Sequence, residues 1–172
     1  IEGATNEDGR GSCVWDNFAR QAGKVVNNDD GRQACDHYHR YKQDVAMMKE
    51  FGIDAYRFSL AWPRIMPSGE GALNQKGLEF YDKLIDELLA KEIQPWVTLF
   101  HWDLPQDLQD KYSGWQSKEV AKRFADYTAI AVERYSDRVK NWFTINEIRC
   151  FTTFAHRQTF HAPGGAKAEQ IV

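Results

Sequence analysis

Residues 142–147 read Trp-Phe-Thr-Ile-Asn-Glu, and this stretch decides the fold. Aromatic and β-branched residues are typical of a buried parallel strand, and the polar pair Asn146-Glu147 stands where such a strand leaves the core. A carboxylate held there is expected to be partly desolvated, which raises its pKa towards the range of a general acid. Glu147 is therefore the leading catalytic candidate, although a Glu after a strand is often only the first solvated residue of a loop.

Two similar units precede this strand, so the chain reads helix, strand, helix, strand, helix, strand. The repeat of roughly forty residues is typical of a parallel α/β sheet. Each helical pattern starts at a capping residue, and each strand is a short run of apolar residues. The caps are Asp36, Asn74 and Ser117, and the predicted strands cover 53–60, 94–100 and 139–145.

Every predicted strand ends in a polar and aromatic cluster, at residues 57–64, 101–103 and 146–147. In a (β/α) barrel these ends meet on one face, where the active site lies. An open, doubly wound sheet would also gather its strand ends, so the periodicity does not choose between the two. No Gly-rich phosphate fingerprint follows any strand, which counts against nucleotide binding.

The composition is that of a globular domain or part of one. The 172 residues are 42% hydrophobic and 13% aromatic, and the formal net charge is -3. That charge argues against partnership with nucleic acid or an anionic membrane. No apolar run reaches the length of a membrane span, and no targeting signal is visible. Three cysteines, an odd number, argue against a disulfide framework and favour a cytoplasmic location, although a chain that has lost its start would also have lost a signal peptide.

One further segment and two tryptophans matter for function. The segment 2–36 is rich in Gly, Asn, Asp and Arg and is predicted to be an irregular, functional loop. Trp62 and Trp102 each follow a strand-like run, where aromatic rings can form platforms for sugar faces.

No metal site is expected. His37 and His39 are two residues apart on a predicted helix and so face different directions. A site built from His156 and His161 is judged equally improbable.

A series of short motifs adds a family resemblance. The motifs are Glu2-Gly3-Ala4, Glu7-Asp8-Gly9-Arg10-Gly11, Trp15-Asp16, His39-Arg40-Tyr41, Tyr56-Arg57-Phe58-Ser59, Trp62-Pro63-Arg64-Ile65, His101-Trp102-Asp103-Leu104-Pro105, Thr144-Ile145-Asn146-Glu147 and His161-Ala162-Pro163-Gly164. In this order they resemble the consecutive motifs of glycoside hydrolase family 1, the β-glucosidase family.

The resemblance implies an α/β fold, a TIM (β/α)8 barrel of which this chain covers roughly strands 2–4 and their helices. Residues 1–172 would form one partial domain, with 1–36 as an irregular loop after a missing first strand and 37–172 as three βα-type units. The implied activity is hydrolysis of β-O-glycosidic bonds with retention, by a double displacement that uses two carboxylates. The implied substrate is a β-glucoside or a related oligosaccharide, and no cofactor is implied.

The motifs also imply residue roles. Glu147 would be the acid/base, Asn146 would hold the sugar 2-hydroxyl, and His101 and Trp102 would contact the glycone. Arg57 would support the nucleophile, since a guanidinium that never deprotonates keeps a partner carboxylate ionised. Without the family pattern, Arg57 reads equally well as an ion-pair residue, Asn146 as a strand-end cap and His101 as a core histidine.

The chain departs from the family pattern in ways that bear on activity. The family's nucleophile motif does not occur in it, and a complete barrel takes about 250 residues. Ile148 replaces the Pro that usually follows the acid, whereas the retained Glu147 argues against the thioglucosidase branch. Asp103 looks structural and is left out of the catalytic set.

Two interpretations follow from these departures. In the first, the chain is part of a glycosidase whose nucleophile lies elsewhere, and the isolated chain is inactive. In the second, it is a non-catalytic half-barrel that binds sugar weakly, forms homo-oligomers through its open sheet edges or needs a complementary chain. The choice among glucose, galactose, fucose and 6-phosphoglucose is expected to depend on later loops.

Overall fold

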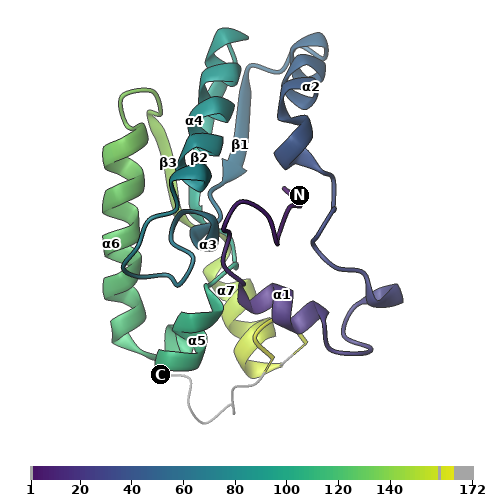
Figure 1. Cartoon of the computed structure of the whole chain (residues 1–172), viewed down its shortest axis with the longest axis vertical. Helices are drawn as coiled ribbons and strands as arrows, with labels where there is room; N and C mark the ends of the chain where they lie inside the picture. The colour runs from purple at the N-terminus through teal and green to yellow at the C-terminus, as the bar shows by residue number, and fades with distance from the viewer. Residues whose placement is uncertain (1, 159, 165–172) are drawn as a thin grey trace.

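Three parallel strands form one sheet in the order β1-β2-β3 (Figure 1). The structure, a computed structural model, describes residues 2–158 and 160–164. The strands are β1 (Ala55–Ser59), β2 (Gln94–Phe100) and β3 (Asn141–Ile145). The strand predicted over 94–100 is confirmed, and the other two are shorter than predicted by two or three residues, a margin common at strand ends. In Figure 1 the arrows point to the end of the molecule where the short helices α1, α5 and α7 lie.

Three long helices alternate with the strands, as predicted. They are α2 (His37–Glu50), α4 (Gln75–Ala90) and α6 (Lys118–Tyr135). Helix α4 packs against α2 and β2, and its apolar side chains are buried at the spacing of one helical face. The remaining elements are α1 (Val14–Ala19), η1 (Val26–Asn28), α3 (Trp62–Ile65), α5 (Gln106–Tyr112), η2 (Gly114–Gln116), α7 (Ile148–Phe151) and the π-helical turn η3 (Thr152–Arg157).

Only one of the three predicted caps acts as a cap through its side chain. Ser117 Oγ accepts a hydrogen bond from the Glu119 N–H at 3.2 Å. Asn74 and Asp36 do precede their helices, but their side chains bind elsewhere. The Asn74 amide donates to the backbone carbonyls of Asp8 and Arg64, and the Asp36 carboxylate lies 2.6 Å from Nδ1 of His39.

The segment 2–36 is not irregular throughout, because it contains α1. Val14 and Phe18, four residues apart, are both buried. The helix starts where Asp16 accepts a hydrogen bond from the Cys13 N–H at 2.8 Å. This i, i+4 apolar pair with an acidic residue in the first turn is a helix signal that the many turn-forming residues around it obscured.

Trp62 is completely buried, so its predicted role as a sugar platform is wrong. The chain turns into α3 directly after β1, which carries the indole ring under α6, where it stacks on Tyr127 at 5.0 Å between ring centroids. The Trp62 Nε1 group donates to the carbonyl oxygen of Gly69 at 3.2 Å. Trp62 is therefore a core residue.

Part of the opposite face of the sheet is exposed among the described residues. Trp96 and Phe143 are 38% and 36% exposed, and their rings lie 5.8 Å apart. The guanidinium carbon of Arg57 lies 4.5 Å from the centre of the Phe143 ring. Because the strands of a parallel sheet are normally covered on both faces, these three residues define a surface that we call the uncovered face.

A buried charge ties the N-terminal segment to the core. Arg64 is fully buried, and its Nε group donates to Glu2 at 2.8 Å. The hydroxyl group of Tyr81 donates to the same carboxylate and accepts from the Ala61 N–H at 2.7 Å. A buried guanidinium is tolerated only when it is paired in this way.

No helix in the part of the chain that the structure describes has the length and apolar character needed to cross a bilayer.

Replacing Tyr81 with Phe tests how much the hydrogen bonds of Tyr81 to Glu2 and Ala61 stabilise the fold. We expect the free energy of unfolding to fall by about 1–3 kcal/mol, because the Ala61 N–H and a Glu2 oxygen lose a buried partner. Urea denaturation measures the loss. The matched control is Tyr41→Phe, because the Tyr41 hydroxyl makes no hydrogen bond to another described residue, and a change below about 0.5 kcal/mol is expected there. Equal effects of the two substitutions would contradict the assignment.

Candidate active site

Arg57 on β1 is hydrogen-bonded to a side chain on β2 and to one directly after β3, near the C-terminal ends of the strands. Arg57 of β1 donates from Nη2 to Asn146 Oδ1 at 2.7 Å and from Nε to Thr98 Oγ1 of β2 at 2.9 Å. The backbone N–H of Asn146 donates to the carbonyl of Phe100 at 2.9 Å, which extends the β2–β3 ladder by one bond. Arg57 and Asn146, both predicted from the sequence, are therefore in direct contact.

Trp102 joins the same unit from the end of β2. Its Nε1 group donates to the backbone carbonyl of Asn146 at 2.9 Å. Its φ of +77° lies in the left-handed region, which is unusual for a bulky residue and stores backbone strain. His101, the residue before it, is exposed. Three of the predicted residues, Arg57, Asn146 and Trp102, are thus connected by hydrogen bonds, and His101 flanks them.

Glu147 stands directly before α7, and its φ of +44° is also left-handed. The side chain is exposed, so the partial desolvation expected from the sequence is not found. The reason is that Glu147 follows the strand that borders the uncovered face, and no described residue shields it. Burial and a hydrogen bond to the Glu147 carboxylate raise the pKa of the Cys150 thiol, which places Cys150 next to this acid.

A cavity of about 500 Å³ lies along these strand ends, which is large enough for a sugar ring. Arg57, Thr98 and His101 line it on the side of the sheet, and Trp15 lines it on the side of the N-terminal segment. The sequence analysis did not name Thr98 or Trp15 as site residues. A polar residue inside the apolar strand β2 was the available signal for Thr98.

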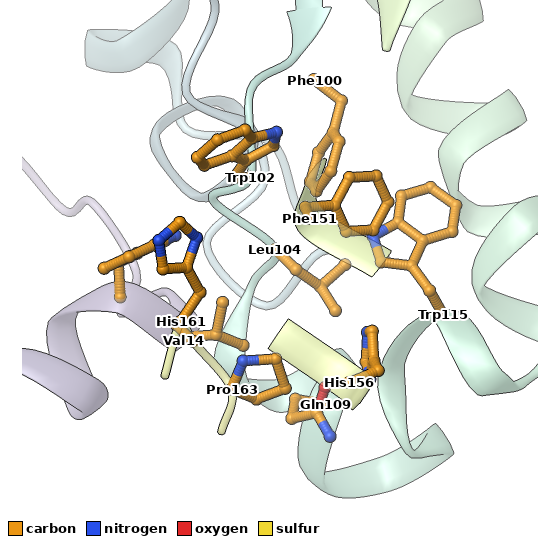
Figure 2. Close-up of a pocket in the computed structure, with 12 residues that line it drawn as sticks. Val14, Phe100, Trp102, Leu104, Gln109, Trp115, Phe151, His156, His161 and Pro163 are labelled. Atoms are coloured by element: carbon orange, nitrogen blue, oxygen red, sulfur yellow. The ribbon is translucent and has the colours of Figure 1, made fainter. Parts of the chain in front are cut away.

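A second, much smaller cavity lies beyond Trp102. Figure 2 shows Trp102, Phe100, Phe151 and Trp115 arranged around it, with His161 at one side. Its volume of about 10 Å³ has room for roughly one water molecule and not for a sugar. The larger cavity is therefore the one that can hold a sugar ring, and it is lined by Arg57 and His101 but not by Trp102, Asn146 or Glu147.

Burial and nearby charge favour the neutral form of His101. Partial burial lowers the pKa of His101, and the positive charge of Arg57 lowers it further, whereas Glu147 acts in the opposite direction. A neutral imidazole has one donor and one acceptor nitrogen, which suits a sugar hydroxyl group.

Two of the histidines considered for metal binding, His37 and His39, have carboxylate partners. His37 lies 2.5 Å from Asp44, and His39 contacts Asp36 and Glu7. Within residues 2–158 and 160–164, no group of three or more His, Cys, Asp and Glu side chains is arranged to hold a metal ion.

The whole of the sequence, residues 1–172, matches the family described as Glycosyl hydrolase family 1. The chain belongs to this family. β-Glucosidase A of Thermotoga maritima is 49% identical over 164 residues, which are 95% of this chain and 36% of that protein. β-Glucosidase 34 of Oryza sativa is 47% identical over 163 residues, or 95% of this chain and 32% of that protein.

Solved structures of family 1 members agree in fold. The family 1 β-glucosidase of Thermotoga maritima superposes with a TM-score of 0.95 at 48% identity, covering 97% of this chain and 38% of that one. A rice β-glucosidase gives a TM-score of 0.95 at 47% identity, with 98% and 35% coverage. The chain spans about a third of the length of the relatives it matches, and its three-stranded sheet is part of a TIM barrel.

Replacing Arg57 with Gln tests the electrostatic coupling at this site. We expect the pKa of His101 to rise, because the positive charge that opposes its protonation is removed, so His101 stays protonated to higher pH. NMR titration of the His101 ring measures this. Arg40→Gln, on the exposed side of α2, is the control and should leave the titration unchanged. An unchanged or lower pKa in Arg57→Gln would contradict the coupling.

Proposed function

We propose that the protein containing this chain is a retaining β-glycosidase that acts on a β-glucoside or a related oligosaccharide. The observation that carries the proposal is the hydrogen-bonded Arg57–Asn146 pair, with Glu147 beside it, at the joined ends of three parallel strands. Membership of glycosyl hydrolase family 1 supports it, as do relatives named β-glucosidase at 47–49% identity.

Glu147 is the acid/base in this proposal. In the first step a nucleophilic carboxylate attacks the anomeric carbon, while Glu147 donates its proton to the glycosidic oxygen and the aglycone leaves. In the second step Glu147 takes a proton from water, the water oxygen attacks the anomeric carbon, and the nucleophile leaves. The exposed position of Glu147 implies that the rest of the barrel supplies the walls that tune this acid.

The nucleophile is proposed to lie outside this chain. Among the described residues, three carboxylates line the large cavity. Glu2 is paired with Arg64, Asp16 accepts from Arg10 at 2.7 Å, and desolvation raises the pKa of Asp103 to about 7, which disfavours its ionised form. A nucleophile must be ionised and free to reach the sugar, so a carboxylate from another part of the barrel is required.

The sugar contacts follow from the groups that remain available. Asn146 Oδ1 is occupied by Arg57, which leaves the amide N–H₂ group to donate to the 2-hydroxyl of the sugar. Trp102 is anchored through Nε1, so its ring face is left for apolar contact with the glycone. Arg57 supports the ionised nucleophile through its fixed positive charge.

For the isolated 172-residue chain we infer a second state, a non-catalytic half-barrel. The uncovered face and the open edges of β1 and β3 support it, because exposed apolar surface and unpaired strand edges promote association. Such a chain would bind sugar weakly, form homo-oligomers or join a complementary polypeptide.

Replacing Glu147 with Gln in the full-length protein tests the acid/base role. We expect kcat/KM for a β-glucoside with a poor leaving group to fall by about 10²–10⁴-fold, because proton donation is lost. The loss should be smaller for an aryl glucoside whose leaving group needs no proton. Glu133→Gln, an exposed acid on α6, is the control and should be unaffected. Full activity of Glu147→Ala on both substrates would overturn the acid/base assignment. Release of the α-anomer first, detected by NMR, would instead overturn the retaining mechanism.

Complementation tests the location of the nucleophile. We expect the purified 172-residue chain to show no turnover of an aryl β-glucoside and to associate in light scattering. Addition of the remainder of the barrel should restore hydrolysis, because it brings the second carboxylate. Turnover by the chain alone, abolished by Glu147→Gln, would place the second carboxylate within these residues.

A further inference from the structure

A third cavity lies among α1, α5 and η3, at the end of the molecule where the short helices gather (Figure 1). Its volume is about 330 Å³, which falls within the range of about 300–1,000 Å³ found for small-molecule sites. None of the described residues lines both this cavity and the larger one along the strand ends. The proposed hydrolysis does not use it, and we call it the amide cavity.

The polar side chains around the amide cavity are uncharged. Besides the imidazole of His156 they are carboxamides and one hydroxyl group, from Asn17, Gln21, Gln106, Gln109, Ser113 and Gln116. No Asp, Glu, Lys or Arg among the described residues lines it. Carboxamides both donate and accept hydrogen bonds, so they match a ligand whose own groups do both, as hydroxyl groups do.

Two buried polar atoms of this lining have no partner. His156 is only 5% exposed, and its Nδ1 atom makes no hydrogen bond to a described residue. The same holds for Oε1 of Gln109. Both residues also line the small cavity beyond Trp102, and Figure 2 shows them next to each other. Because burying such atoms without partners is unfavourable, their position in the wall of a cavity points to a ligand that pairs with them.

The Gln109 amide occupies a position that depends on a glycine. A Cβ atom on Gly114 would lie 2.2 Å from Gln109 Oε1, and the φ of Gly114 is +59°. Glycine at 114 therefore leaves the room that this oxygen fills and adopts the backbone conformation that the turn requires. The unpaired oxygen is thus held by the shape of its surroundings.

Two further amides are oriented by bonds to their neighbours. Nε2 of Gln106 donates to Asp110 at 2.7 Å, which leaves Oε1 of Gln106 as an acceptor. Oδ1 of Asn17 accepts from Arg20 at 3.0 Å, which leaves the Asn17 N–H₂ group as a donor. The amide cavity therefore offers donors and acceptors together.

The imidazole adds no charge. Burial lowers the pKa of His156, so the ring is neutral near pH 7 and its Nδ1 atom donates or accepts according to the tautomer. A hydroxyl group can pair with Nδ1 of His156 and donate to Oε1 of Gln109 at the same time. An ionic ligand would find no opposite charge among the described lining residues.

One wall of the amide cavity is apolar. Val14 and Phe18 of α1 are both 3% exposed, and Pro163 lines the cavity beside them. A sugar ring presents C–H groups as well as hydroxyl groups, so this wall and the amides together match its two kinds of surface.

We propose that the amide cavity is a non-catalytic binding site for a neutral polyhydroxylated ligand, such as a monosaccharide. One hydroxyl group of the ligand binds His156 and Gln109, and others bind Gln106 and Asn17. The site is separate from the large cavity and does not depend on the proposed hydrolysis.

Titration of the full-length protein with D-glucose, followed by NMR, tests the proposal. The signals to follow are those of the His156 ring and the Gln109 side-chain amide, because both report on this cavity alone. We expect Gln109→Met and His156→Phe each to raise the Kd at this cavity about tenfold, since shape is kept and hydrogen bonds are lost. Gln43→Met, at an exposed position on α2, is the control and should leave the Kd unchanged. An absence of shifts in the wild-type protein, or an unchanged Kd in both variants, would overturn the proposal.

Stability distinguishes a binding role from a structural one. Replacing an unpaired buried polar group by an apolar group of the same shape is nearly neutral or stabilising. We therefore expect Gln109→Met to keep or raise the midpoint of urea denaturation in the absence of glucose. A lower midpoint would show that the oxygen is paired within the fold, for example through a water molecule in the small cavity, and would overturn the proposal.

Charged probes and a crystal structure test the kind of ligand. Glucuronate should bind the amide cavity more weakly than glucose, and equal affinity would contradict the neutral class. A crystal structure of the full-length protein with its own side chains filling the cavity would also overturn the proposal. Absence of glycosidase activity would overturn the proposed function alone, because glucose binding at the amide cavity requires no turnover.

Discussion

The guanidinium of Arg57 on β1 bonds to Thr98 on β2 and to Asn146 directly after β3, and the rest of the site depends on these contacts. A parallel sheet fixes the backbone of its strands but leaves the side chains at their ends free to point apart. Arg57 prevents this by reaching across the sheet from β1, where it donates to Thr98 on β2 and to Asn146 after β3. A planar, permanently charged donor with several N–H groups suits such bridging, and Lys would not replace it.

The N-terminal segment supports the same site from behind. Glu2 binds the buried Arg64, and Arg10 is held by Asp16 beside the loop that carries Trp102. Two buried guanidinium groups, each paired with a carboxylate, thus fix a segment that has little regular secondary structure. Because an unpaired buried charge is very unfavourable, these pairs specify the path of the segment better than apolar contacts alone would.

Periodicity and capping were enough to predict the helix–strand order, and the strand 94–100 has the predicted bounds. Family-like motifs selected Arg57 and Asn146, which the structure joins by a hydrogen bond. The burial of Trp62 and the exposure of Glu147 could not be predicted, because each depends on what packs over the residue. Helix α1 was missed because only Val14 and Phe18 carry its apolar signal, among many turn-forming neighbours.

The uncovered face has a consequence for how such a site acquires its chemistry. Arg57 lies over Phe143 on that face, so its charge is still partly screened by water. When the rest of a barrel covers Trp96 and Phe143, it also removes water from around Arg57. The local dielectric constant then falls, and the attraction of Arg57 for a carboxylate becomes several times stronger. In the proposed glycosidase, closure of the barrel and electrostatic activation of the site are therefore one event.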